Sequence, residues 1–285
     1  MDEIELQTGV RVGVSVAGEG QPLLLLAGLG MPAIVWEFSG LSTQLVDAGF
    51  SVISFNARGI PPSSAPPAPY SVEDLAADAI EVLRELGHDS DVVVVGYSLG
   101  SYVAQALLRQ HPTVFSAAVL MAGLDPSPIL ELVDTMELDL IESTGALPTA
   151  VSTFELLMTT LPIKTVQDPQ AVSGWQDILG DDGSRWTSVD GLAGQLSASR
   201  DWSRDRIEHL NALSAIAVPA LSLAFEHDVF FPPATERAAA GSIPGCEHVV
   251  VADAAHGGLS THPEEPVRVI VDFCQRVRTA VGPQT

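Results

Sequence analysis

The sequence has few lysines, few cysteines and no long apolar run, and each shortage narrows what the protein can do. Lys164 is the one lysine among 13 basic residues, and 36 Asp and Glu residues bring the net charge to −23. Such a charge repels nucleic acid and anionic membranes, so we expect neither as a partner. It also disfavours a polyanionic substrate. The longest apolar run, at about residues 22–29, is far shorter than the ~20 residues of a membrane-spanning helix.

The scarcity of cysteine bears on the cellular compartment and on metal binding. Cys246 and Cys274 could form one disulfide, but the acidic first residues lack the apolar segment of a secretory signal. We therefore expect a soluble, cytoplasmic protein in which both thiols are reduced. The sequence contains no Cys–His cluster and no H-E-x-x-H motif, so we expect no metal site. Residues 28–30 lack the third glycine of a dinucleotide-binding loop, so we expect no cofactor.

The length and the apolar content suit one large α/β domain with an insertion, because 46% of the 285 residues are apolar. Alternating apolar and polar residues at 4–18 predict an antiparallel hairpin that turns at Thr8-Gly9. Buried strands then alternate with helices. The predicted strands span residues 23–27, 50–55, 92–95, 117–122, 218–225 and 248–252. The predicted helices span residues 36–48, 72–86, 102–111, 233–241 and 263–281, the second of them after a capping box at Ser71–Asp74.

This alternation stops between Asp125 and about Leu213. No strand-like run occurs there, and helices are predicted at residues 128–143, 149–161, 172–179 and 192–198. We therefore predict a helical lid at residues 125–213, inserted after the sixth strand between core segments 1–124 and 214–285. The whole pattern predicts an α/β fold, with a doubly wound, mostly parallel β-sheet of about eight strands and an antiparallel start. A functional site is then expected beyond the carboxyl ends of the strands.

The most informative motif is Gly96-Tyr97-Ser98-Leu99-Gly100. It follows four consecutive valines and precedes an apolar helical pattern. A G-x-S-x-G sequence between a buried strand and a helix is typical of a nucleophile elbow, a sharp turn that exposes the serine hydroxyl. Glycines two residues on either side of the serine avoid the clash that a Cβ would cause at such a strained turn. We therefore predict that Ser98 is a nucleophile rather than part of an ordinary turn.

With these pieces in order, the chain resembles the α/β-hydrolase superfamily over nearly its whole length. The matching segments are the elbow, Ala27–Gly30 at the place of the family's oxyanion loop, Asn56–Gly59, Phe225–Asp228 and Ala254–Gly257. Their order of nucleophile, acid and histidine is the one that the family uses. The resemblance implies the family's fold and an enzyme, and it implies little about the substrate.

A serine nucleophile needs a base to take its proton, and that base needs an anionic partner. His256 is predicted as the base because it follows a buried strand in a short loop with two glycines; His262 lies nearby and is the alternative. Asp228 is predicted as the partner because it follows a buried strand 28 residues before His256, where the resemblance places the family's acid. Glu226 and Asp125 are the alternatives. Asp125 is the main one, because it follows the preceding strand of the sheet.

The oxyanion of a tetrahedral intermediate needs two donors aimed at it. The N–H of Leu99, directly after the nucleophile and at the start of a helix, is one predicted donor. The resemblance implies the N–H of Leu29 as the second. The chain departs from the family at three positions, where Ala27 replaces the usual histidine, Asn56 the usual aspartate and Ser101 a common glycine. We interpret Ala27 as the sign of a different brace for the oxyanion loop.

Several apolar and aromatic residues could line a substrate pocket, although core packing is the alternative for each. The candidates are Gly28, Met31, Trp36, Tyr97, Met158, Phe230 and Phe231. Further residues of the predicted lid that could contribute are Met136, Leu157, Trp175 and Trp186. Phe230 and Phe231 are of most interest because they directly follow the predicted acid.

Together these residues favour a serine hydrolase that cleaves an ester, thioester or lactone of a mainly apolar small molecule through an acyl-enzyme on Ser98. The alternatives on the same fold are an acyl-transfer or cyclising enzyme, a lyase, a C–C bond hydrolase and a perhydrolase. A complete set of candidate residues argues against a non-catalytic ligand receptor. A serine at position 98 argues against the branches of the family that need a carboxylate nucleophile. We expect a monomer or homodimer whose partner is its small-molecule substrate.

Overall fold

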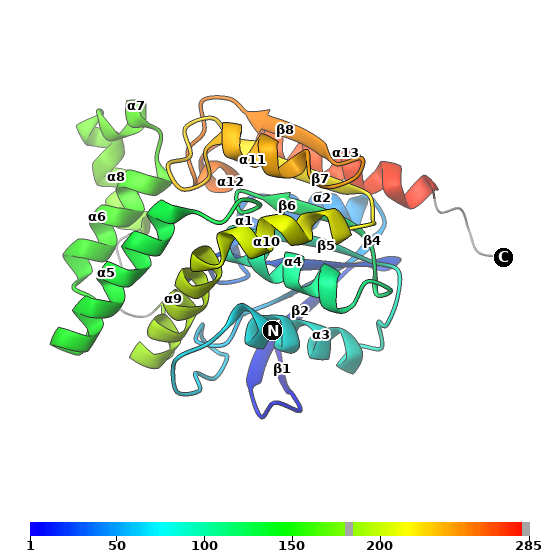
Figure 1. Cartoon of the computed structure of the whole chain (residues 1–285), viewed down its shortest axis with the longest axis horizontal. Coiled ribbons are helices and arrows are strands. Elements are labelled where there is room, and N and C mark those ends of the chain that lie inside the picture. The colour runs from blue at the N-terminus through cyan, green and yellow to red at the C-terminus, as the bar shows by residue number, and fades with distance from the viewer. Residues whose placement is uncertain (180–184, 281–285) are drawn as a thin grey trace.

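The computed structural model describes residues 1–179 and 185–280 and arranges them around one eight-stranded sheet (Figure 1). The strand order is β1-β2-β4-β3-β5-β6-β7-β8. The strands are β1 (Asp2–Glu5), β2 (Arg11–Ala17), β3 (Gln21–Leu26), β4 (Phe50–Phe55), β5 (Val92–Tyr97), β6 (Phe115–Met121), β7 (Ala220–Phe225) and β8 (Glu247–Val251). β2 pairs antiparallel with β1 and β4, and every pair from β4 to β8 is parallel. The predicted mostly parallel sheet with an antiparallel start is confirmed.

Helices cover both faces of the sheet, which explains why the parallel strands are apolar on both sides. Every residue of β4, β5 and β7 is buried. Helices α3 (Val72–Glu85) and α4 (Leu99–Gln110) lie in front of the sheet in Figure 1. Helices α2 (Leu41–Asp47) and α13 (Glu264–Ala280) contact each other on the opposite face. Because the middles of the strands are closed on both sides, reactive groups can meet a ligand only at the strand ends.

Local sequence sets where these helices begin and end. The capping box at Ser71 is confirmed, because the N–H of Asp74 donates to the Ser71 hydroxyl and the N–H of Ser71 donates to the Asp74 carboxylate. The single helix predicted over residues 36–48 is wrong. The chain forms α1 (Val35–Phe38) and then α2, because Gly40 between them takes a left-handed φ of 77°.

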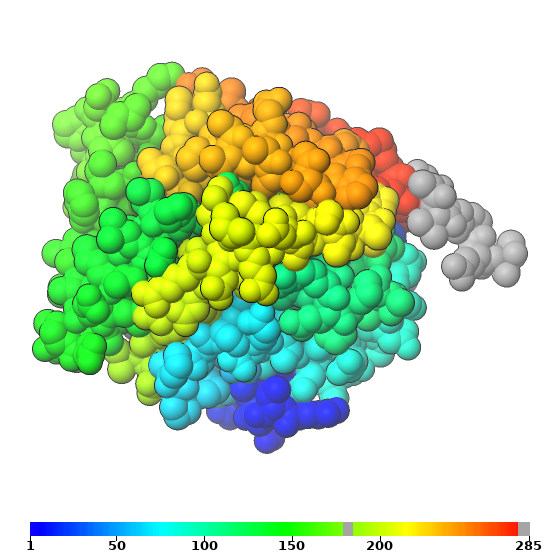
Figure 2. All heavy atoms as spheres, viewed as in Figure 1, coloured from blue at the N-terminus to red at the C-terminus, as the bar shows by residue number. Residues whose placement is uncertain are grey.

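Between β6 and β7 the chain is helical, and no strand lies there within the described ranges. The helices are α5 (Pro128–Thr144), α6 (Thr149–Thr160), α7 (Ile163–Val166), α8 (Pro169–Leu179), α9 (Val189–Arg204) and α10 (Arg206–Ala212), which we call the inserted helices. α5 packs against α9, and α5 to α8 form a block at one end of the sheet, green in Figures 1 and 2. Two further helices, α11 (Pro233–Ala240) and α12 (Gly258–Thr261), lie in the last part of the chain. Among the described residues, no helix combines the length and the apolar character needed to cross a bilayer.

The start of α4 lies so close to the end of β3 that Gly100 has no room for a side chain. A Cβ there would lie 2.0 Å from the carbonyl oxygen of Leu26, a backbone atom that cannot rotate away. We expect Gly100→Ala to lower the free energy of unfolding by roughly 2–3 kcal/mol or more, as overpacking does. Gly174→Ala in α8 is the matched control, because nothing lies within 4 Å of its Cβ position, and we expect it to be neutral or stabilising. Urea denaturation measures both, and equal stability of the two variants would contradict this close approach.

Candidate active site

Ser98 lies at the sharp turn between β5 and α4. Its backbone angles, φ 55° and ψ −120°, are unusual for a residue with a side chain. The flanking glycines permit the turn, because a Cβ on Gly96 would lie 2.3 Å from the carbonyl oxygen of Gly100. α4 begins at Leu99, so the serine stands at a helix N-terminus. This strand–turn–helix geometry is that of a nucleophile elbow.

Three side chains from separate strand ends form a hydrogen-bonded chain. His256 Nε2 lies 3.0 Å from Ser98 Oγ, and His256 Nδ1 lies 2.8 Å from Asp228 Oδ2. Ser98 follows β5, Asp228 follows β7 and His256 follows β8, so the shared carboxyl edge of the parallel strands brings them together. In this arrangement His256 can take the proton of Ser98, while Asp228 orients the ring and stabilises its charged form.

Backbone and aromatic contacts hold the histidine and the aspartate in place. Oδ1 of Asp228 accepts the N–H groups of Phe230 and Phe231 at 2.9 and 3.0 Å, which leaves Oδ2 for His256. The Phe231 ring stacks on the imidazole and the Phe230 ring meets it edge-on, with centroids 5.5 and 5.4 Å away. The Tyr97 hydroxyl donates to the carbonyl oxygen of His256. The imidazole is therefore fixed between the serine and the aspartate.

The alternative acids and the alternative base are engaged elsewhere. Asp125 accepts two hydrogen bonds from the guanidinium of Arg206, at 2.7 and 2.8 Å. Glu226 is exposed and accepts the N–H of Asp253. Nδ1 of His262 lies 2.9 Å from the hydroxyl of the preceding threonine. The structure therefore brings Asp228, and not these residues, to the imidazole that faces the serine.

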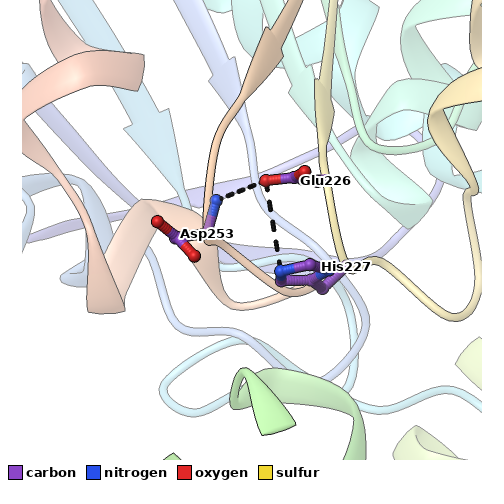
Figure 3. A group of neighbouring side chains, drawn as sticks. All are labelled: Glu226, His227 and Asp253. Atoms are coloured by element: carbon purple, nitrogen blue, oxygen red, sulfur yellow. Dashed lines mark hydrogen bonds and ion pairs between the residues drawn. The ribbon is translucent and has the colours of Figure 1, made fainter. Parts of the chain in front are cut away.

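A group of exposed polar side chains lies on the loops that follow β7 and β8. Glu226, His227 and Asp253 (Figure 3) are the described residues whose ligand atoms lie close enough together to hold a metal ion. The ammonium of Lys164 bonds Asp253 at 2.7 Å, and Glu226 accepts the N–H of Asp253. These internal contacts account for the cluster, so it carries no argument for a metal.

Two backbone N–H groups without a partner among the described residues lie on segments next to Ser98. In the ranges that the structure describes, the N–H groups of Leu29 and Leu99 donate to no protein acceptor, which leaves both for an oxyanion. A Cβ on Gly28 would lie 3.3 Å from the Cβ of Ser98, so the loop that carries Leu29 is adjacent to the serine. The two donors predicted from the sequence thus lie on segments that adjoin Ser98.

Gln195 in α9 braces the loop that carries Leu29 and Gly30. Its Oε1 accepts the N–H of Gly30 at 3.0 Å, and its Nε2 donates to the carbonyl of Arg58 at 2.8 Å. Gln195 is 1% exposed, so losing either bond would leave a buried polar group without a partner. The chain thus has a brace where Ala27 replaces the usual histidine. Sequence reasoning missed Gln195, because 165 residues separate it from Gly30 and no local pattern marks the contact.

The inserted helices also hold the loop that carries the histidine. The N–H groups of His256 and Gly257 donate to the carbonyls of Thr159 and Thr160, at 3.2 and 3.1 Å. These carbonyls lie in the last turn of α6, where a helix leaves its own acceptors unused. Both loops that face the serine are therefore bonded to the inserted helices.

A cavity of about 810 Å³ lies between the strand ends and the inserted helices, and Ser98 and His256 line it. Of the pocket residues predicted from the sequence, those that line it are Gly28, Met31, Tyr97 and Phe230, with Trp175 and Trp186 from the inserted region. Most of the remaining lining is apolar. A small molecule that fills this cavity can therefore place a reactive bond at Ser98 and bury the apolar part of its structure against the lining.

Three of the predicted pocket residues lie elsewhere, as do Met136 and Leu157. Trp36 is fully buried in the hydrophobic core, and Phe231 is fully buried behind the imidazole on which it stacks. Met158 is 41% exposed. The residues of α6 that line the cavity recur at helical spacing, and Met158 lies off that face.

Sequence reasoning also missed the polar part of the cavity. Asp134 and Glu137 of α5, Glu155 of α6 and Ser199 of α9 all line it. One sequence pattern points to these polar residues: a single face of the predicted helix carries Leu130, Asp134 and Glu137. An acid on the buried face of an amphipathic helix is uncommon, and this pattern could have indicated the site.

Glu236 in α11 is a fully buried acid on which the charges of Asp228 and Asp125 act. Its carboxylate accepts the N–H groups of Leu124 and Asp125. Burial raises the pKa of Glu236 to about 8, the two N–H bonds offset part of the rise, and the negative charges of Asp228 and Asp125 add to it. Glu236 therefore holds a proton at neutral pH, which limits the negative charge close to Asp228.

Comparison with known proteins gives relatives of similar length. A family model described as the alpha/beta hydrolase fold matches residues 21–145. A Mycobacterium tuberculosis protein named "Putative non-heme bromoperoxidase BpoC" is 29% identical over 266 residues, which are 92% of this chain and 96% of that protein. The crystal structure of BpoC matches with a TM-score of 0.81 and 27% identity, over 93% of this chain and 96% of that chain.

Two further solved structures are similar in fold. A thermophilic esterase from Thermogutta terrifontis matches with a TM-score of 0.82 and 22% identity, over 98% of this chain and 100% of that chain. The enol-lactonase from Burkholderia xenovorans LB400 matches with a TM-score of 0.79 and 21% identity, over 96% of this chain and 99% of that chain. At these identities the likeness shows the fold and not the reaction.

The raised pKa of Glu236 predicts a pH dependence of stability. The pKa of Glu236 is 4.5 in an ordinary environment and about 8 in the folded protein. Between these two pH values, Glu236 keeps a proton in the folded protein that it has lost in the unfolded chain. The free energy of unfolding therefore falls as pH rises through this window, by up to about 1.4 kcal/mol per pH unit from this group. Glu236→Gln keeps an acceptor but cannot ionise, so we expect a shallower decline and a more stable protein at pH 8.

Urea denaturation at several pH values between 5 and 8 measures this difference. Glu19→Gln, in an exposed turn, is the matched control and should keep the slope of the wild type. If Glu236→Gln and wild type show parallel profiles, Glu236 does not hold a proton in the folded protein.

Proposed function

The chain belongs to the α/β-hydrolase superfamily, and on that premise we propose that it is a serine hydrolase. Its proposed substrate is an ester, thioester or lactone of a mainly apolar small molecule. The observation that carries the proposal is the hydrogen-bonded chain from Ser98 through His256 to Asp228, with distances of 3.0 and 2.8 Å. A serine hydroxyl is activated when a base lies within hydrogen-bond reach and a third group orients that base.

In the proposed reaction, His256 takes the hydroxyl proton while Ser98 Oγ attacks the carbonyl carbon of the substrate. The N–H groups of Leu29 and Leu99 stabilise the oxyanion that forms. His256 then gives the proton to the leaving alcohol or thiol, and an acyl-enzyme on Ser98 remains. Water attacks the acyl carbon, again with His256 as base, and the acid is released with the serine hydroxyl restored.

We propose that the inserted helices act as the lid of this site. They form one wall of the cavity and bond both loops beside Ser98, the oxyanion loop through Gln195 and the histidine loop through the end of α6. Excluding water from such a site strengthens the electrostatic stabilisation of the oxyanion. It would also favour an acyl acceptor held in the cavity over bulk water, which keeps acyl transfer or cyclisation as a variant of the same chemistry.

The name of the BpoC relative supports a second candidate, a perhydrolase. Hydrogen peroxide would then replace water at the acyl-enzyme, so that the products are a peracid and the free serine. The same Ser98, His256 and oxyanion donors serve both reactions. Peracid formation from a short carboxylic acid and hydrogen peroxide, absent in Ser98→Ala, would favour this candidate over a hydrolase without peroxide chemistry.

The proposal predicts covalent labelling at one residue. A fluorophosphonate probe should form one adduct per chain, on Ser98, because the activated hydroxyl displaces fluoride and the oxyanion donors bind the phosphoryl oxygen. Intact mass and peptide mapping locate the adduct. Ser98→Ala should show none, and His256→Ala should react at least about 10³-fold more slowly because the base is lost. An adduct on another residue, or none on folded wild-type protein, would contradict the proposal.

The identity of the acid can be tested with two aspartates. We expect Asp228→Asn to lower kcat for 4-nitrophenyl ester hydrolysis by about 10⁴-fold, because an amide neither selects the reactive tautomer nor stabilises the imidazolium. Asp125→Asn is the matched control. It loses charge in the pair with Arg206 but does not contact the imidazole, so kcat should stay within a few-fold of wild type. Steady-state kinetics on both variants decide, and the reverse pattern would assign Asp125 as the acid.

A further inference from the structure

The cavity beside Ser98 has one polar wall in an otherwise largely apolar lining. Asp134 and Glu137 of α5, Glu155 of α6 and Ser199 of α9 form it, and we call these four residues the acidic wall. Asp134 and Glu137 lie one helical turn apart, on the face of α5 that meets the cavity. Among the described residues of the lining, Arg185 is the one arginine or lysine. Acidic side chains therefore outnumber arginine and lysine side chains in the described lining of the cavity.

By hydrogen-bond geometry, three atoms of the acidic wall have no partner within the described ranges: Asp134 Oδ2, Glu137 Oε1 and Ser199 Oγ. The Ser199 hydroxyl is still near enough to Asp134 to offset part of the rise in the pKa of that carboxyl. The residues of these three atoms are 2%, 3% and 1% exposed. Buried polar atoms of folded proteins almost always have a partner, because leaving one unpaired costs stability. No residue of the proposed hydrolase mechanism makes use of these atoms. These unused acceptors thus belong to residues that line the cavity, and they lie directly behind its surface.

We propose that the acidic wall binds an organic ammonium group, so that the substrate is an ester, thioester or lactone that carries a basic amine. The substrate class rests on the hydrolase function proposed above, whereas the ammonium site rests on the wall itself. An ammonium group has three donors and a positive charge, and it has no acceptor. It therefore matches two buried carboxylate oxygens and a hydroxyl oxygen that lack partners.

The electrostatics of the acidic wall suit a bound cation. Burial raises the pKa of Asp134 and of Glu137, and the neighbouring Glu155 raises that of Glu137 further. Burial raises the pKa of Glu155 as well. The positively charged or titratable basic groups that act on the wall are Arg185 and His256 near Glu155 and Arg200 near Asp134. Raised pKa values favour the neutral forms of these carboxyls, and a bound ammonium would favour their ionised forms by supplying a counter-charge.

The rest of the lining suits the remainder of such a molecule. Leu156, Leu192 and Leu196 offer apolar surface for a hydrocarbon body. Trp175 and Trp186 line the same cavity, and the face of an indole ring attracts organic cations. An anionic ligand would supply no counter-charge to the carboxyls of the acidic wall. A neutral alcohol could use the same acceptors but would bring no charge, so comparing an amine with an alcohol isolates the proposed recognition.

Calorimetric titration of the full chain with n-hexylammonium and with 1-hexanol, near neutral pH, tests the proposal. We expect the amine to bind at least about tenfold more tightly, because charge-assisted hydrogen bonds are roughly twice as strong as neutral ones. Equal affinity, or tighter binding of the alcohol, would overturn the proposal without any variant.

Matched variants locate the binding. Glu137→Gln and Asp134→Asn keep side-chain shape while removing charge, and each should reduce the preference for the amine by about tenfold. Glu142→Gln, exposed on the same helix, should leave that preference unchanged. Circular dichroism shows that each variant is folded. If the folded Glu137→Gln and Asp134→Asn variants both keep the wild-type preference, the ammonium site lies elsewhere and the proposal fails.

Two activity measurements on the same samples separate this inference from the proposed function. Fluorophosphonate labelling of Ser98 reports the hydrolase alone. If Ser98 is not labelled but amine binding depends on Glu137, the result supports the ammonium site and contradicts the proposed substrate class. If labelling succeeds, the substrate class is tested by kcat/KM for 4-nitrophenyl 6-aminohexanoate against 4-nitrophenyl heptanoate. Wild type should prefer the amine ester, Glu137→Gln should lose that preference, and an unchanged ratio would overturn the class.

Discussion

Parallel strand pairing is the constraint on which the arrangement of this molecule depends. Strands that run in the same direction end at the same edge of the sheet, so the loops after β3, β5, β7 and β8 emerge side by side. Those loops carry Leu29, Ser98, Asp228 and His256. The helices on both faces seal the rest of the sheet, and this edge is where polar groups and a ligand can meet.

The sequence predicts this arrangement well wherever the information is local. Ser98 is marked by its glycines and by the valine strand before it, and Asp228 and His256 each follow a buried strand at the expected place. A rule of topology then assembles them, because strand order in a mostly parallel sheet brings the three loops to one edge. The helix break at Gly40 was missed, since an apolar periodicity continues through a residue whose left-handed backbone ends the first helix.

The parts that the sequence does not predict are those made by packing between distant segments. In the sequence, Gln195 looks like any polar residue of a helix, and its role depends on the packing of α9 against the loop that carries Gly30. Trp36 and Phe230 have the same apolar character in the sequence, yet one fills the core and the other lines the cavity. The acidic wall depends on the relative rotation of α5, α6 and α9. Such rotations follow from side-chain fit over many contacts, and no short motif encodes them.

The hydrogen bonds between the inserted helices and the loops that carry Gly30 and His256 have a consequence for the evolution and engineering of this chain. An insertion attached to the core only through its two ends could be exchanged for another by recombination. Here Gln195 and the end of α6 supply contacts that the core lacks. A transplanted insertion would have to bring a glutamine and two helix-end carbonyls to the same points. New specificity is therefore more accessible through substitutions within α5, α6 and α9 than through replacing them as a module.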